Sequence, residues 1–221
     1  MADDMASELD DLWHEADTHV EHGCFDKAVE IYKYILIRYN DNSIASERAH
    51  ARLGETLLML GQSGLAERHI RKALSYDPEN PRYHSLLGFI YYTQYQWKNA
   101  SNEYKLALDR EPWNRDYLRA LANATFCSGD RKRGLEYLHE AAVFNPDNSG
   151  MLVELATAYL SIGDIASAKR YAEEAVQVNP SDVMAHVVLR RIRQKMLTDL
   201  ETKEGKNAQD DVQDSQRTRM P

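Results

Sequence analysis

The side chains with the greatest capacity for metal chemistry gather near the N-terminus. They are His14, His19, His22 and Cys24. A structural zinc ion needs four converging ligands, which on a helix requires spacings of three or four residues along one face. The histidines are five and three residues apart, and Cys24 falls in an expected turn. We therefore predict no metal site and no cofactor.

Residue spacings typical of enzymes do not occur in the sequence. It contains no GxSxG, no P-loop, no glycine-rich phosphate-binding fingerprint and no HExxH. Acidic residues are numerous, but no pair of them is set apart as a general acid and a general base. The sequence accordingly predicts a protein without enzymatic activity.

Composition restricts the classes of partner. The 221 residues include 27 Lys and Arg against 35 Asp and Glu, a formal net charge of −8, which opposes non-specific binding to nucleic acid or anionic membranes. Two cysteines far apart, Cys24 and Cys127, suit a reducing compartment. The acidic N-terminus does not resemble a signal peptide, and no apolar run reaches the roughly 18–20 residues that span a bilayer. We expect a soluble, cytoplasmic protein with neither nucleic-acid binding nor membrane insertion.

The elements that position these side chains follow a repeat of 34 residues. It runs without a gap through residues 47–80, 81–114, 115–148 and 149–182. Position 7 holds Leu53, Leu87, Leu121 and Leu155. Position 32 holds Pro78, Pro112, Pro146 and Pro180. Only glycine or alanine occupies positions 8, 20 and 27. Each unit therefore reads as two amphipathic helices, with small residues where their backbones approach closely and a proline before the next unit.

Turn and cap residues support the same division. Asn80, Asn114, Asn148 and Asp182 stand at position 34, where each is expected to cap the following helix. Gly61, Gly129 and Gly163 stand at position 15, where a left-handed residue is expected between paired helices. Tyr95 takes that position in the unit 81–114, so we predict a locally different turn there.

The ends of the array depart from the consensus. Residues 9–42 form a first repeat that matches the pattern less well, with Glu15, Ile35 and Asn40 at positions 7, 27 and 32. Residues 1–8 are a short acidic segment, and residues 183–200 are predicted as a capping helix without a second half. Residues 201–221 are predicted as a disordered polar tail. The repeat array as a whole then covers residues 9–200.

The position-specific pattern resembles that of the tetratricopeptide repeat (TPR) family. The resemblance implies an all-α fold, a right-handed α-solenoid of about five TPR helix-turn-helix repeats plus a C-terminal capping helix. It also implies that positions 2, 5, 9, 12 and 13 line a concave groove that holds a partner peptide. Within that groove the candidate binding residues are Arg82, Phe89, Tyr92, Arg119, Asn123, Phe126 and Thr157.

Each of these residues also has a structural interpretation. Phe89, Tyr92 and Phe126 are either anchors for a partner or packing residues against the next repeat. Arg82 and Arg119 either pair with partner carboxylates or are solvated or paired within the chain, for example with Asp116. Both interpretations stay open at this point.

Two functions follow from the resemblance. The first is a non-catalytic adaptor or scaffold that binds a protein partner of unknown identity, and the alternative is a holding chaperone for apolar client segments. One branch of the family captures C-terminal carboxylates, but here Arg119 and Asn123 are followed by Glu154, Met184 and Val188, which breaks that pattern. A homodimer through the capping helix, around Val187 and Ile192, is a further hypothesis.

Overall fold

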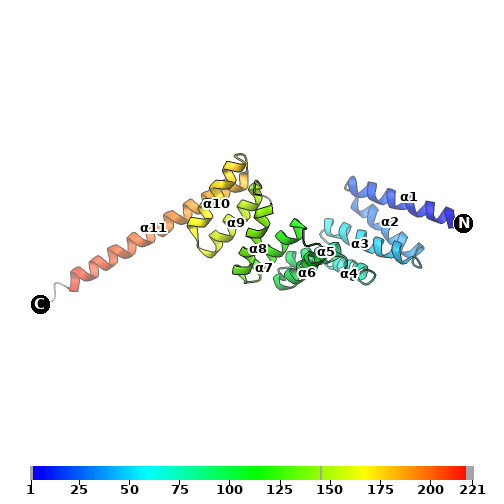
Figure 1. Cartoon of the computed structure of the whole chain (residues 1–221), viewed down its shortest axis with the longest axis horizontal. Coiled ribbons are helices and arrows are strands. Elements are labelled where there is room, and N and C mark those ends of the chain that lie inside the picture. Colours follow the sequence, from blue (N-terminus) through cyan, green and yellow to red (C-terminus); the bar gives the residue numbers. More distant parts are fainter. Residues whose placement is uncertain (1, 145, 218–221) are drawn as a thin grey trace. The chain divides into compact units, whose positions relative to one another are not determined.

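The structure, a computed structural model, describes the backbone of residues 2–144 and 146–217 and the side chains of residues 5–144 and 146–201. Every element in the described chain is an α-helix (Figure 1). The helices are α1 (Ala2–Glu21), α2 (Phe25–Arg38), α3 (Ser43–Met59), α4 (Ser63–Leu74), α5 (Pro81–Thr93), α6 (Trp97–Arg110), α7 (Arg115–Cys127), α8 (Arg131–Phe144), α9 (Ser149–Ile162), α10 (Ile165–Val178) and α11 (Val183–Arg217). The prediction of an all-α fold of about five helix pairs with a C-terminal helix is confirmed.

The chain divides into two compact units, residues 1–134 and residues 135–221. In the first unit, each helix from α1 to α7 packs against the next one along the chain. In the second unit, α9 packs against α10, and α11 packs against both. α8 contributes to both units, because the division falls after Gly134.

Small residues lie at the helix contacts, as their recurrence predicts. Ala66, Ala100 and Ala107 are fully buried. A Cβ atom added to Gly88 on α5 would lie 2.8 Å from the Tyr104 ring on α6. Such a distance is far shorter than van der Waals contact, so these helices approach as closely as their backbones and facing side chains allow.

The predicted caps and turns are also formed. The side chains of Asn80, Asn114, Asn148 and Asp182 each accept a hydrogen bond from a backbone N–H in the first turn of the next helix. Gly61, Gly129 and Gly163 have φ angles of 72°, 104° and 85°. These glycines therefore supply the left-handed residue that ends the first helix of each pair.

Tyr95 corrects the prediction that its turn differs. It adopts the same left-handed conformation, with φ of 61°, although it is not glycine. Its N–H donates to Tyr92 O and the Gln96 N–H donates to Tyr91 O, the bonds that Gly61 and Gln62 make one repeat earlier. The exposed Tyr95 ring packs edge-on against Trp97 at 5.3 Å. Repeat geometry therefore overrides the local preference of a tyrosine for negative φ.

The two ends are more helical than the sequence predicts. α1 begins at Ala2, within the segment expected to precede the array. α11 continues to Arg217, so residues 201–217, predicted as a disordered tail, are helical, and residues 218–221 lie outside the described residues. Residues 201–217 lack proline, and nine of these 17 residues are Glu, Lys, Gln, Arg or Ala, which favour a helix once α11 has started.

Ile192 does not offer the exposed surface that the homodimer hypothesis assigns to it. It is 1% exposed and belongs to the core of the second unit, where α11 packs with α9 and α10. Val188 and Leu189 are buried in the same core. The apolar stripe of α11 therefore caps this unit.

Histidines at position 4 pack against position 23 of the same repeat. The Nδ1 atoms of His50 and His69 are 2.9 Å apart, so one ring donates to the other when both are neutral. His84 Nδ1 lies 2.7 Å from a carboxylate oxygen of Glu103 at the equivalent positions. Burial, reinforced by the nearby His69 and Lys72, lowers the pKa of His50 to about 4. Burial also lowers the pKa of His69.

We predict that Gly88→Val destabilises the first unit because its side chain would overlap the buried Tyr104 ring. The free energy of unfolding should fall by roughly 1–3 kcal/mol, measured by urea denaturation. Gly64→Val is the matched control, since a Cβ atom there meets nothing within 4 Å. Its effect should stay within about 0.5 kcal/mol. Equal losses in the two variants would show that the helices are not in close contact at Gly88.

We predict that stability falls as the pH is lowered from 6.5 towards 4. In that interval the unfolded chain binds a proton at His50 that the folded chain, with the lower pKa, does not bind. Urea unfolding at pH 7.0, 5.5 and 4.5 measures this loss. His50→Gln should reduce the slope, whereas His14→Gln, an exposed histidine on α1, should leave it unchanged. Identical slopes for His50→Gln and the wild type would contradict the assignment.

Candidate partner-binding surface

The first helices of successive repeats bring position 9 of one repeat to position 2 of the next at α1–α3 and at α3–α5. At α1–α3 the carboxylate of Asp17 lies 3.8 Å from the Arg48 guanidinium. At α3–α5 the carboxylate of Glu55 lies 2.6 Å from the Arg82 guanidinium. We call these two ion pairs the arginine ladder. We call each contact between two successive first helices a step. At these two steps of the first unit, the facing charges are neutralised by residues of the chain itself.

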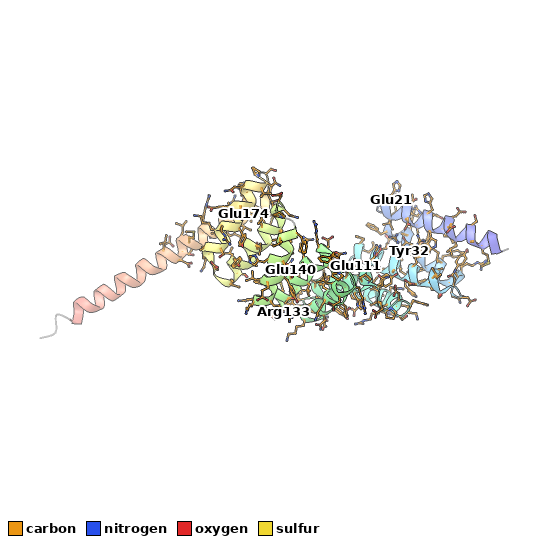
Figure 2. All side chains as sticks on the ribbon, viewed as in Figure 1. Glu21, Tyr32, Glu111, Arg133, Glu140 and Glu174 are labelled. Atoms are coloured by element: carbon orange, nitrogen blue, oxygen red, sulfur yellow. The ribbon has the colours of Figure 1, made fainter. Side chains whose placement is uncertain are left out.

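We call each ion pair of the arginine ladder a rung. In the first rung, Asp17–Arg48, the arginine also contacts an aromatic ring. The Arg48 guanidinium lies over the Trp13 ring, 4.2 Å from its centre, so one cation contacts both an aromatic face and a carboxylate. Tyr32, labelled in Figure 2, lies on α2, and its hydroxyl donates to Asp17 Oδ1 at 3.2 Å. Burial and the Asp17 carboxylate together raise the pKa of Tyr32 well above its usual range. Trp13 is 5% exposed and is thus part of the core.

The second rung is built around one carboxylate shared by two arginines. Glu55 Oε1 contacts Arg82 of the next repeat, and Glu55 Oε2 lies 3.5 Å from Arg52 of its own helix. A carboxylate has lone pairs for several donors, so both contacts are satisfied together.

The arginine ladder does not continue at α5–α7, because the residues at position 9 and at position 2 of the next repeat are of other types there. Position 9 is Phe89, which is 48% exposed, and position 2 of the next repeat is Asp116, whose side chain is 89% exposed. Among the described residues, the ion pair made by Asp116 is with Arg119 of the same helix, at 3.9 Å. This step therefore presents an aromatic ring and a carboxylate where the earlier steps hold a closed ion pair.

A pocket of about 200 Å³ lies at the same step. It is lined by Phe89, Tyr92, Tyr104, Arg119, Ala120 and Asn123. Burial raises the pKa of Tyr104 well above its usual range, so its hydroxyl is neutral at physiological pH. We call the pocket residues together with Asp116 the α5–α7 surface. It combines aromatic walls with polar groups at its edge, as small binding sites commonly do.

Four of the seven candidate residues come together here: Phe89, Tyr92, Arg119 and Asn123. Arg82 lies one step earlier, in the ladder. Phe126 is half-buried on α7 and does not line the pocket; its backbone lies 2.6 Å from where a Cβ atom on Gly134 would stand. Thr157 belongs to the second unit, where its hydroxyl donates to Val153 O.

This surface also includes residues that the repeat pattern does not single out as binding residues. Tyr104 on α6 packs against Gly88 at the helix contact, and it also lines the pocket. The Tyr92 ring stacks edge-on against Trp97 at 4.8 Å, which links the pocket to Tyr95 in the following turn. The tyrosine at a position otherwise held by glycine was the available signal for this aromatic extension.

Metal-ligating side chains do not cluster in the part of the chain that the structure describes. Over the described residues, no three His, Cys, Asp or Glu side chains converge in a way that could hold a metal ion. His22 Nδ1 lies 2.7 Å from Thr18 O, and His19 lies 3.8 Å from the Glu15 carboxylate. None of the helices in the described part of the chain has the length and apolar character needed to cross a membrane.

Comparisons with known proteins agree with this architecture. Two family models, each described as a tetratricopeptide repeat, match residues 19–90 and 149–182. No curated protein matches the sequence. The chain is thus related to the family through its repeats.

Solved structures share the fold at low sequence identity. A tetratricopeptide repeat protein from Parabacteroides merdae is 15% identical, with a TM-score of 0.78 over 97% of this chain and 81% of that one. YrrB, described as a TPR protein with an unusual peptide-binding site, is 15% identical, with a TM-score of 0.67 over 79% of this chain and 88% of that one.

A longer relative is matched in part. For the APC/C hetero-tetramer Cut9-Hcn1, the match has 18% identity and a TM-score of 0.64 and covers 80% of this chain but 34% of the matched chain. This chain therefore spans about a third of that relative's length. The repeated helix pairs, the family models and the shared fold lead to one conclusion: the chain is a tetratricopeptide repeat protein.

Proposed function

We propose that the chain is a non-catalytic adaptor that binds a segment of a partner protein on the α5–α7 surface. The observation that carries this proposal is the end of the arginine ladder at Phe89 and Asp116, beside a pocket with aromatic walls. Repeats of this family generally serve protein–protein interaction, and YrrB is described as having a peptide-binding site. The proposal assigns the partner segment to one step of the first unit.

Physical differences between the steps support that assignment. At α1–α3 and α3–α5 the facing charges already neutralise each other, and a partner would have to break an ion pair to reach them. At α5–α7 the exposed half of Phe89 gains from burial, since aromatic side chains dominate interface energetics. Tyr92 and Asn123 add groups that fix the orientation of a bound backbone.

The holding-chaperone alternative requires a broad apolar surface that accepts many clients. The arginine ladder makes the first helices polar over two of the three steps described in the first unit. A pocket of about 200 Å³ suits one anchoring side chain rather than a long apolar segment. These features favour the adaptor.

We predict that Phe89→Ala weakens binding of peptides selected on the wild-type protein by about tenfold or more, because Phe89 is the exposed aromatic anchor. Peptides would be selected from a random dodecapeptide display library on the immobilised full chain. Their dissociation constants would then be measured by fluorescence polarisation with each variant.

Leu106→Ala on α6 is the matched control. Leu106 is 43% exposed, close to the 48% of Phe89, but lies on a second helix outside the pocket. Binding to Leu106→Ala should equal binding to the wild type, and both variants should unfold at similar urea concentrations. If the selected peptides bind Phe89→Ala and the wild type equally well, the assignment of the site is refuted. Indifference of the wild type to peptide sequence would instead favour the holding chaperone.

A further inference from the structure

We infer that the α5–α7 surface recognises an arginine side chain of the partner segment, held between the Phe89 ring and the Asp116 carboxylate. This inference rests on the proposed function and names the chemistry of its ligand. The two ion pairs of the arginine ladder show how this protein binds guanidinium groups with its own residues.

The first rung shows the type of site. Arg48 is held by an aromatic ring below its plane and a carboxylate at its edge, namely Trp13 at 4.2 Å and Asp17 at 3.8 Å. A guanidinium suits both contacts because it is planar, stacks on aromatic faces and donates several hydrogen bonds along its edge. An aromatic ring next to a carboxylate is thus the arrangement that this chain uses to hold an arginine.

The second rung shows that a carboxylate already paired within its helix accepts a second arginine. Arg52, three residues before Glu55, approaches one carboxylate oxygen, and Arg82 of the next repeat takes the other. At Asp116 the same-helix partner is Arg119, three residues later, which approaches Oδ1. The contact with Arg119 therefore leaves room for a second guanidinium, as the contact with Arg52 does at Glu55.

The α5–α7 step offers the same two kinds of group, an aromatic ring and a carboxylate, but on facing helices rather than on one helix. Phe89 occupies position 9, and Asp116 occupies position 2 of the next repeat, the two positions that meet at both earlier steps. Over the described residues, no cation is recorded over the Phe89 ring. Asp116 brings a negative charge to the position where the earlier steps have Arg48 and Arg82. The missing component is a cation with a flat face, and the partner supplies it.

The probe for this inference is N-acetyl-arginine amide, titrated into the ¹⁵N-labelled full chain and followed by amide chemical shifts. The expected result is a saturable shift of the amides of Phe89 and Asp116. N-acetyl-citrulline amide, which has nearly the same shape but no charge, should cause at most a third of that shift. Asp116→Asn should weaken the arginine response at least about threefold, the scale of an exposed ion pair. The matched control Asp26→Asn, an exposed aspartate in the first turn of α2, should leave it unchanged.

Peptides separate this inference from the proposed function. The inference predicts that peptides dependent on Phe89 share an arginine and that its replacement by citrulline weakens binding to the wild type about tenfold. On Asp116→Asn the same replacement should weaken binding about threefold less, because the ion pair is already absent there while the contact with Phe89 remains. Two results would overturn the inference while the adaptor proposal stands. One is that Phe89-dependent peptides lack arginine. The other is that replacing the arginine by citrulline lowers the affinity for Asp116→Asn as much as the affinity for the wild type. If no peptide depends on Phe89, the adaptor proposal fails, and the response to N-acetyl-arginine amide then decides the inference by itself.

Discussion

The close approach of paired helices at small residues is the constraint from which the rest of the structure follows. Side chains no larger than alanine at positions 8, 20 and 27 fix how near the two backbones lie, as the space around Gly88 shows. The spacing recurs every 34 residues from residue 47 onwards, and positions 9 and 2 face each other at α3–α5 and also at α1–α3. We infer that positions 9 and 2 are likewise neighbours at α5–α7.

Constant geometry with varying residues lets a repetitive fold present one step that differs from the others. The pairs Asp17–Arg48 and Glu55–Arg82 join successive helices at two steps of the first unit and neutralise each other's charges there. Phe89 and Asp116 occupy the equivalent positions at the third step, where the chain does not neutralise itself in the same way. We propose that binding specificity comes from the α5–α7 step, because its residues at positions 9 and 2 differ from those of the other two steps.

The sequence predicts the features that depend on local chemistry and periodicity. Asn80 and Asn114 cap helices as expected, because capping needs only a side-chain oxygen at the right position. It does not predict which lining residues pair across repeats, so both interpretations of Arg82 stay open until the structure shows its ion pair with Glu55. Tyr95 shows another limit, since a left-handed tyrosine is imposed by neighbouring repeats and cannot be inferred from residue preference.

The most direct test introduces an ion pair at the α5–α7 step and measures whether peptides still bind. The double variant Phe89→Glu with Asp116→Arg places at α5–α7 the acid and the arginine found at α3–α5. We expect that peptides selected on the wild-type chain no longer bind this variant in fluorescence polarisation, while its urea midpoint is equal to or above that of the wild type. Undiminished binding by a folded double variant would contradict the account, since the open step would then have no part in recognition.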